Sequence, residues 1–332
     1  MENTEGKQGI RKSGCGYRDI RLSGLKIPQS ALRNPQLIQL IDCHFHLDES
    51  IISLPGLIES MDAAGVERVA LIPRLCPPLS LSFPFAQLTG VFQRLIHREG
   101  GPVQRGAVAF YKSMVKGDGT VVLGGKRYSV IPQPPNDEVR KAVTLHPDRF
   151  YGRTFVNPAG PTDPVSEIEI SLKVPGMIGV KAHPYWHNYP VAKLADAAAL
   201  ASEKGLHFLI HLGPDDHGDF RLLPERFPKL KIIYAHTGIP YAAAVCAYAR
   251  EKKNVYIDLS ATDYVDRKTA ALAVGRAGAG KCLFGTDGPY FHTAGGRFDY
   301  GPSIQIIRGL GLSREDLERV EKNNFLAIIE RI

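Results

Sequence analysis

Several features that define whole classes of protein are missing from this sequence of 332 residues. No uninterrupted apolar stretch approaches the ~20 residues that a membrane-spanning helix needs. The polar, Gly-rich segment from Met1 to Leu22 lacks the apolar core of a signal peptide. We therefore predict a cytoplasmic protein that does not contact a membrane.

Cysteine is scarce and widely spread. The five cysteines, Cys15, Cys43, Cys76, Cys246 and Cys282, form no C-x-x-C pair. An odd number at such spacing argues against a disulfide framework and favours reduced thiols in a cytosolic enzyme.

The sequence also lacks a basic block. Its 41 Lys and Arg exceed its 34 Asp and Glu, which gives a net charge of +7. The basic residues are scattered and do not alternate with aromatics, so we predict no nucleic-acid partner. A small anionic substrate is the alternative reason for the charge.

What the sequence does contain is a repeat of short apolar runs and helix-like segments. The runs are Ile38–Cys43, Val66–Ile72, Phe150–Val156, Met177–Lys181, Leu206–Leu212, Leu230–Ala235, Val255–Leu259 and Cys282–Phe284. Most are too short for helices, so we predict eight strands. The predicted helices are Leu54–Ala64, Asp137–Leu145, Val165–Leu172, Val191–Lys204, Leu222–Phe227, Tyr241–Lys252, Arg267–Ala277 and Arg314–Ile329, the last with Ser313 as its N-cap.

Strands that alternate with helices indicate right-handed βαβ units and a parallel sheet. Eight repeats favour a closed (β/α)8 TIM barrel, an α/β fold, over residues 38–332. A doubly wound open sheet would more typically carry a Gly-rich phosphate loop after its first strand. Here the first strand ends in His44-Phe-His46 instead.

Two stretches stand outside the repeat. Residues 1–37 have no clear periodicity and are predicted to be an N-terminal extension. An insertion of about residues 74–148 separates the second and third strands, which is far longer than an ordinary connection.

Within this insertion we predict a helix over Phe85–His97 and a hairpin of Thr120–Leu123 and Lys126–Ile131 that turns at Gly124–Gly125. We expect the insertion to lie over the active-site mouth as a lid or as the contact of a homodimer. A tolerated surface excursion is the structural alternative.

Side chains that can carry chemistry occur at the ends of several predicted strands. His44 and His46 end the first strand, and residues two apart on a strand face the same side. His211, His236 and Asp287 end the fifth, sixth and eighth strands, each beside Gly or Pro. In a barrel these ends share the rim where enzymes of this fold place their chemistry.

Each of these residues alone has a structural reading, such as a turn-forming Asp or a hydrogen-bonded His. Together they predict a metal centre. Imidazoles with a carboxylate suit Zn²⁺ best, and Mn²⁺, Fe²⁺, Co²⁺ and Ni²⁺ are alternatives.

This set of motifs resembles the amidohydrolase superfamily. The resemblance is carried by His44-Phe-His46, Gly179-Val-Lys-Ala-His-Pro184, His211, His236 and Phe284-Gly-Thr-Asp287-Gly-Pro289. The run Leu145-His-Pro-Asp-Arg-Phe-Tyr-Gly152 with Val156-Asn-Pro158 is similar to the amidohydrolase-related branch that contains the aminocarboxymuconate-semialdehyde decarboxylase-like enzymes. The resemblance covers the chain from about Ile38 onward.

The resemblance implies a role for each matching residue. His44, His46 and His211 would be metal ligands, together with Asp287, which would also be catalytic, and His236 would be a catalytic hydrogen-bonding group. The lysine that precedes Ala-His-Pro, Lys181, matches the branch with one metal ion. One divalent ion is therefore expected, with Lys181 as a substrate contact or a buried structural lysine.

Such a site implies metal-activated hydrolysis of an amide, ester or lactone bond in a small, carboxylated molecule. Non-oxidative decarboxylation of an unsaturated or aromatic acid at the same ion is the alternative. A barrel kept only as a binding scaffold would be expected to have lost a ligand, and the full set is present.

Further candidates follow other strands at the same rim. The predicted substrate contacts are Lys181, His183, Trp186, Arg74, Asn157 and Tyr290. Packing between loops and ordinary hydrogen bonding are their alternative roles. Asp258 and Ser260, at the end of the seventh strand, are expected to make hydrogen bonds within the barrel.

Overall fold

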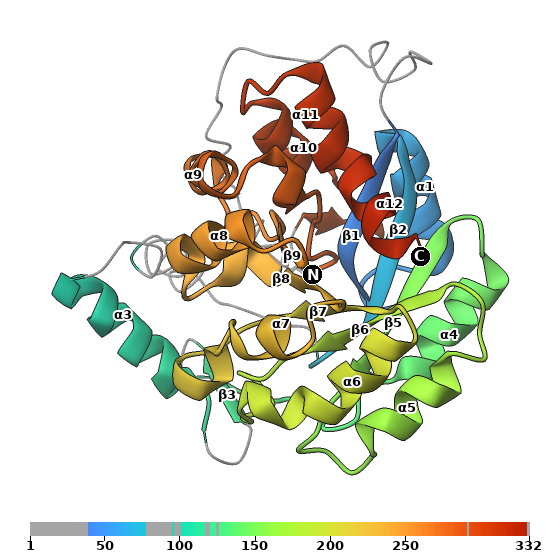
Figure 1. The fold of residues 1–332 in the computed structure, drawn as a ribbon. Helices are drawn as coiled ribbons and strands as arrows, with labels where there is room; N and C mark the ends of the chain where they lie inside the picture. Colours follow the sequence, from blue (N-terminus) through green and yellow to red (C-terminus); the bar gives the residue numbers. More distant parts are fainter. Residues whose placement is uncertain are drawn as a thin grey trace, which may run out of the picture. The chain divides into compact units, whose positions relative to one another are not determined.

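The computed structural model describes residues 39–77, 95, 101–116, 120–123, 126–290 and 292–330. Eight parallel strands form one sheet in the order β1-β2-β5-β6-β7-β8-β9-β10. They are β1 Leu40–Leu47, β2 Val66–Pro73, β5 Phe150–Val156, β6 Met177–Ala182, β7 His207–Ile210, β8 Lys231–Tyr234, β9 Val255–Asp258 and β10 Cys282–Leu283. The predicted (β/α)8 barrel is confirmed, with helices between the strands (Figure 1).

The helices of the repeat lie where the hydrophobic pattern predicts them. They are α1 Leu54–Ala64, α4 Asn136–Leu145, α5 Pro164–Ser171, α6 Ala195–Glu203, α7 Leu222–Arg226, α8 Ala242–Glu251 and α9 Arg267–Ala277. Side-chain caps explain several of their first turns. Ser53 accepts a hydrogen bond from the Gly56 amide, and Pro55 lies in the first turn of α1, where its missing N–H costs nothing.

The predicted helix over Arg314–Ile329 is confirmed, although its middle turn is π-helical. An unpredicted helix, α10 Gly301–Arg308, comes first, followed by α11 Arg314–Glu318 and α12 Asn324–Ile329 with a π-helical turn between them. The predicted cap is confirmed, since Ser313 accepts a hydrogen bond from the Asp316 amide at 3.1 Å. A π-helical turn bonds residue i to i+5 in place of i+4, and the sequence carried no signal that predicted it.

The first and last strands of the sheet meet at a junction built from main-chain hydrogen bonds. The Cys43 amide donates to the Phe284 carbonyl at 3.0 Å, and the His46 amide donates to Gly288 at 2.7 Å. A Cβ atom on Gly288 would lie 2.4 Å from the Phe45 ring, so only glycine allows the strands to approach this closely. The junction therefore brings His46 and Asp287 to one place.

The described part of the insertion contains a helix that the sequence did not predict, α3 Gly101–Met114. The predicted hairpin is present as β3 Thr120–Leu123 and β4 Lys126–Ser129, which pair antiparallel. The rest of the insertion's predicted structure, the helix over Phe85–His97 apart from Leu95 and the turn at Gly124–Gly125, lies outside the described residues, as does the extension over residues 1–37.

Candidate metal centre

Two histidines of β1 turn the same ring nitrogen toward the barrel mouth. Nδ1 of His44 donates to a carboxylate oxygen of Asp258 at 2.8 Å, and Nδ1 of His46 donates to the Pro73 carbonyl at 2.9 Å. A carbonyl can only accept, so Nδ1 of His46 carries the hydrogen and Nε2 keeps its lone pair. Both imidazoles are thus held in the tautomer that presents Nε2 to a metal ion.

Asp287 completes a compact donor group with these histidines. Its Oδ1 lies 3.2 Å from Nε2 of His44 and 3.4 Å from Nε2 of His46. Donors about 2.0–2.1 Å from a tetrahedral ion lie roughly 3.3 Å from one another, so the spacing fits a single Zn²⁺-sized ion. Among the described residues, the donor atoms of His44, His46 and Asp287 lie within 4.8 Å of one another.

The charge states of this group suit metal binding. Burial, and then the Lys181 charge, lower the pKa of His44 to about 3, so its imidazole is neutral at pH 7. Burial alone would raise the pKa of Asp287, but the neighbouring His236 and His44 outweigh it and hold that pKa well below its usual range. A neutral imidazole and an ionised carboxylate are the forms that coordinate a divalent cation.

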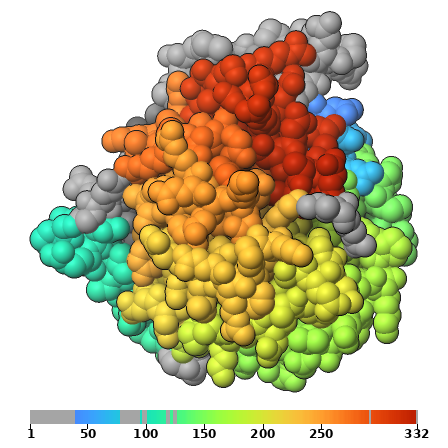
Figure 2. All heavy atoms as spheres, in the orientation of Figure 1, coloured from blue at the N-terminus to red at the C-terminus, as the bar shows by residue number. Residues whose placement is uncertain are grey.

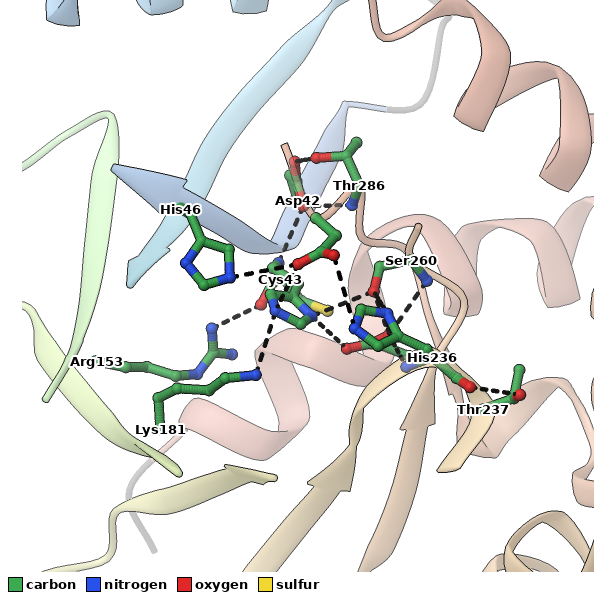
Figure 3. A network of polar contacts seen from close by, with 12 residues as sticks. Asp42, Cys43, His46, Arg153, Lys181, His236, Thr237, Ser260 and Thr286 are labelled. Atoms are coloured by element: carbon green, nitrogen blue, oxygen red, sulfur yellow. Dashed lines mark hydrogen bonds and ion pairs between the residues drawn. The ribbon is translucent and has the colours of Figure 1, made fainter. Parts of the chain in front are cut away.

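Asp258 and Ser260 fix the orientation of His44 and His236. Asp258 is fully buried and, besides His44, accepts hydrogen bonds from the His236 amide at 2.8 Å and from the Ser260 hydroxyl. The Ser260 hydroxyl also lies 2.9 Å from Nδ1 of His236. Figure 3 shows this network joining the ends of β1, β8 and β9. The hydrogen bonds expected of Asp258 and Ser260 are present, and they hold two of the predicted site histidines.

A buried carboxylate on β1, Asp42, holds Thr286, the residue that precedes Asp287. Asp42 accepts hydrogen bonds from the amide and the hydroxyl of Thr286, at 3.1 and 2.6 Å, and from the His44 amide at 3.0 Å. Burial raises the pKa of Asp42 to about 7 against these bonds. One side chain therefore sets the relative position of His44 and Asp287 across the junction.

His236 and Lys181 lie beside the donor group. Nε2 of His236 is 3.7 Å from the second oxygen of Asp287, and its ring stacks on His44 with centroids 5.1 Å apart. Lys181 is buried inside the barrel with Nζ 3.4 Å from Nε2 of His44 (Figure 3). Burial lowers the pKa of this amine to about 8.

His211 is the predicted ligand that lies apart from the compact group. Its ring stacks on His183 with centroids 4.1 Å apart and meets the His236 ring edge-on at 4.9 Å. Its Nε2 lies 3.1 Å from the hydroxyl of Tyr111, on α3. His211 therefore borders the centre, and its Nε2 faces a residue from the insertion.

A cavity opens directly onto these groups. It is lined by His46, Leu75, Cys76, Lys181, His183, Trp186, His211, His236, Tyr264, Asp287 and Tyr290. Four predicted substrate contacts, Lys181, His183, Trp186 and Tyr290, thus lie in its wall. With three aromatic rings and one amine, this wall suits a planar anionic ligand.

The two remaining predicted contacts, Arg74 and Asn157, are not in the wall of this cavity. Arg74 forms an ion pair with Glu138 at 3.3 Å. The Asn157 amide donates to the Pro132 carbonyl at 2.8 Å and its oxygen accepts from the Ala159 amide, which secures the loop after β5. Both side chains hold loops at the rim in this structure.

Sequence reasoning missed three cavity residues, Leu75, Cys76 and Tyr264, and one neighbour of the cavity, Tyr111. Cys76 and Tyr264 lie in the connections after β2 and β9, where only their position just beyond a strand could have suggested them. Tyr111 lies on an unpredicted helix, so no signal pointed to it.

We expect Asp258→Asn to weaken Zn²⁺ binding by about 10–100-fold, the usual cost of losing a hydrogen-bond partner of a metal-binding histidine. Chelator competition with the purified protein measures this change. Asp137→Asn is the matched control, since the Asp137 side chain is 94% exposed. Equal affinities for the two variants would contradict the role given to Asp258.

Fold and site together are those of a TIM-barrel metal-dependent enzyme, and the comparisons with known proteins narrow this class. The amidohydrolase family model matches residues 41–325. The chain belongs to the amidohydrolase family, as the sequence motifs predicted. None of the curated proteins compared with the sequence matches it significantly.

Similar solved structures include both decarboxylases and a hydrolase. The 5-carboxyvanillate decarboxylase of Sphingomonas paucimobilis is 15% identical, with 89% of this chain and 100% of that chain covered at a TM-score of 0.53. A dihydroxybenzoic acid decarboxylase from Polaromonas sp. JS666, with bound manganese, is 16% identical, with 89% and 97% covered at 0.52. A probable 2-pyrone-4,6-dicarboxylic acid hydrolase from Acinetobacter baumannii is 13% identical, with 88% and 99% covered at 0.54. At these identities the likeness shows the fold alone.

The predicted lack of a membrane span can be checked against the helices. In the part of the chain that the structure describes, no helix combines the length and the apolar character needed to cross a membrane.

Proposed function

We propose that this protein is a metal-dependent hydrolase that cleaves an amide, ester or lactone bond in a small carboxylated molecule. The observation that carries the proposal is the donor group of His44, His46 and Asp287, whose spacing fits one ion and whose imidazoles are held ready to bind it. A divalent ion held by these residues would lower the pKa of a bound water toward about 7. Zn²⁺ suits the donors best, and Mn²⁺, Fe²⁺, Co²⁺ and Ni²⁺ are alternatives.

Asp287 is placed to move the proton of this reaction. Its ionised carboxylate accepts the proton from the attacking water while the water oxygen bonds to the carbonyl carbon. The same carboxyl group then returns the proton to the leaving nitrogen or oxygen as the scissile bond breaks. His236, 3.7 Å from the second oxygen of Asp287, polarises the carbonyl and is kept in place by Ser260.

The cavity wall supplies binding for the rest of the substrate. The amine of Lys181 pairs with a substrate carboxylate, and Trp186 and Tyr290 pack against apolar or planar parts. Lys181 is buried, so water competes little for its contact, while Trp186 and Tyr290 are half-buried.

Decarboxylation is the second candidate, favoured by the aromatic side chains and the lysine in the cavity wall and by the decarboxylases among the structurally similar proteins. There Asp287 would first take a proton from water and then deliver it to the ring or alkene carbon, as the bond to the carboxyl carbon breaks and CO₂ leaves. The donor group is the same in both reactions.

The experiment is a screen of lactones, amides and aromatic or unsaturated acids with the metal-reconstituted protein in ¹⁸O-labelled water. Hydrolysis is expected to place ¹⁸O in a carboxylic acid product and to release no CO₂. CO₂ release with one new C–H bond in the product would replace the first candidate with the second. A metal-loaded protein that turns over none of these classes would contradict both.

A further inference from the structure

The insertion brings a polar group to the metal centre that the barrel itself does not supply. Tyr111 lies on α3 and is 3% exposed, with its hydroxyl 3.1 Å from Nε2 of His211. If His211 binds an ion through this nitrogen, the hydroxyl lies beside the ion. A hydroxyl at this position therefore lies next to whatever occupies the space in front of His211.

Contacts with Tyr185 and a buried cluster hold Tyr111 at this position. The Tyr185 hydroxyl, from the loop after β6, donates a hydrogen bond to the Tyr111 carbonyl. The two tyrosine rings stack with centroids 4.2 Å apart at 30°. Ala107, Tyr111, Tyr185 and Ile239 form one buried cluster. Ring and backbone are both fixed, so the direction of the hydroxyl is fixed as well.

The surroundings of this cluster connect it to the cavity. Trp186 and Tyr264 pack against the cluster from their loops and also line the cavity. With His211, they make three cavity residues that contact Tyr111 or its cluster. The Tyr111 hydroxyl therefore lies beside His211, one of the residues that line the space into which a ligand would extend.

The other face of α3 has no comparable role. Ala107 and Tyr111 are the two buried residues of the helix, while Val103 and Phe110 are 51% and 55% exposed. Figure 2 shows α3 in teal at the surface of the molecule. Within α3, the contact with the site depends on a single functional side chain.

We propose that Tyr111 contacts the bound ligand directly, donating a hydrogen bond from its hydroxyl to a ligand oxygen held in front of His211. This inference rests on the proposed function, because it needs an ion and a ligand at the centre. It assigns to the insertion a substrate-contacting residue, and it makes the ligand an oxygen-bearing group that reaches the His211 side of the cavity.

The test compares wild-type protein with Tyr111→Phe, which removes the hydroxyl and keeps the ring. Both are loaded with Co²⁺, and azide is titrated while the visible absorption of the Co²⁺ is recorded. Azide is a small anion that occupies an open coordination position and can accept the hydrogen bond. We expect azide to bind Tyr111→Phe about tenfold more weakly, as loss of one hydrogen bond to a charged acceptor predicts.

A second readout separates ligand contact from support of His211. Chelator competition should give Zn²⁺ affinities for the two proteins within threefold of each other. A tenfold loss of Zn²⁺ affinity in Tyr111→Phe would show that the hydroxyl acts by holding the histidine, and the proposal would be wrong. Tyr256→Phe, on β9 and outside the cavity wall, is the matched control and should change neither quantity.

The remaining outcomes are also decisive. Equal azide affinities in the wild type and Tyr111→Phe would overturn the proposal while leaving the proposed hydrolase intact. A Co²⁺-loaded wild type that takes up no azide would overturn it as well, since no ligand position would lie beside Tyr111. A wild type that binds neither Zn²⁺ nor Co²⁺ would instead sink the proposed function, and the inference with it.

Discussion

Asp287→Asn is expected to lower kcat by about 10²–10⁴-fold, because a carboxamide cannot accept the proton that the carboxylate takes from water. The backbone at Asp287 has φ of 60°, a conformation that Asn adopts as readily as Asp. The variant should therefore keep the wild-type fold. Steady-state rates on the substrate identified by the screen, with circular dichroism of both proteins, measure the effect.

Alanine is the weaker choice at this position, since a left-handed backbone conformation costs an L-residue other than Gly, Asn or Asp about 1–2 kcal/mol. The exposed Asp137→Asn again serves as the control and should retain full activity. An Asp287→Asn protein that turns over substrate at the wild-type rate would show that another group moves the proton.

Removing divalent ions with a chelator is expected to reduce turnover to the uncatalysed level, and adding Zn²⁺ or Mn²⁺ should restore it. The apoprotein should also unfold at a lower temperature. An ion present at a thousand times its dissociation constant stabilises the folded state by about 4 kcal/mol, and that contribution is lost with the ion. Atomic emission, calorimetry and activity assays of one sample follow the three quantities together.

Protons should compete with the ion for the same donors. The imidazoles bind metal only when neutral, so acidification is expected to weaken metal binding and alkaline pH to restore it.

The double variant His44→Ala/His46→Ala is the control for the chelation experiment, since chelation should leave its unfolding temperature unchanged. Full activity in a protein with less than about a tenth of an equivalent of metal would contradict a metal-dependent mechanism.

Much of the fold was predictable because each repeat satisfies local rules. Short runs rich in β-branched and aromatic residues, such as Phe150–Val156, indicate strands, and capping signals such as Ser313 with Asp316 indicate where a helix begins. The helix α3 was missed because its sequence, Gly-Pro-Val-Gln-Arg-Gly, begins with residues of poor helix propensity. Its burial of Tyr111 against the barrel is a tertiary interaction that the sequence does not reveal.

The centre was predictable to the extent that strand ends converge. His44, His46 and Asp287 come together because parallel strands of a barrel present their carboxyl ends at one rim. The spacing along the chain could not show that His211 would lie outside the compact group, since that depends on how far β7 extends. Nor could it show that Asp258 would serve two histidines, because that requires the distances across β1, β8 and β9.

The predicted substrate contacts show the same limit. Trp186 and Tyr290 lie in the cavity wall, whereas Arg74 and Asn157 are engaged with Glu138 and with the loop after β5. All four follow strands at the rim, so position along the chain ranks them equally. Which side chains turn inward is decided by loop conformations that involve partners far away in sequence.

The junction between β1 and β10 has a consequence for how the protein is made. Asp42 and Thr286, which join the two strands there, are 244 positions apart. The imidazoles therefore leave the ribosome long before the carboxylate that completes their donor set, and domains form as units only when their chain is available. The newly made protein can acquire its ion only after nearly the whole barrel has been synthesised, so metal loading would report that synthesis of the barrel is complete.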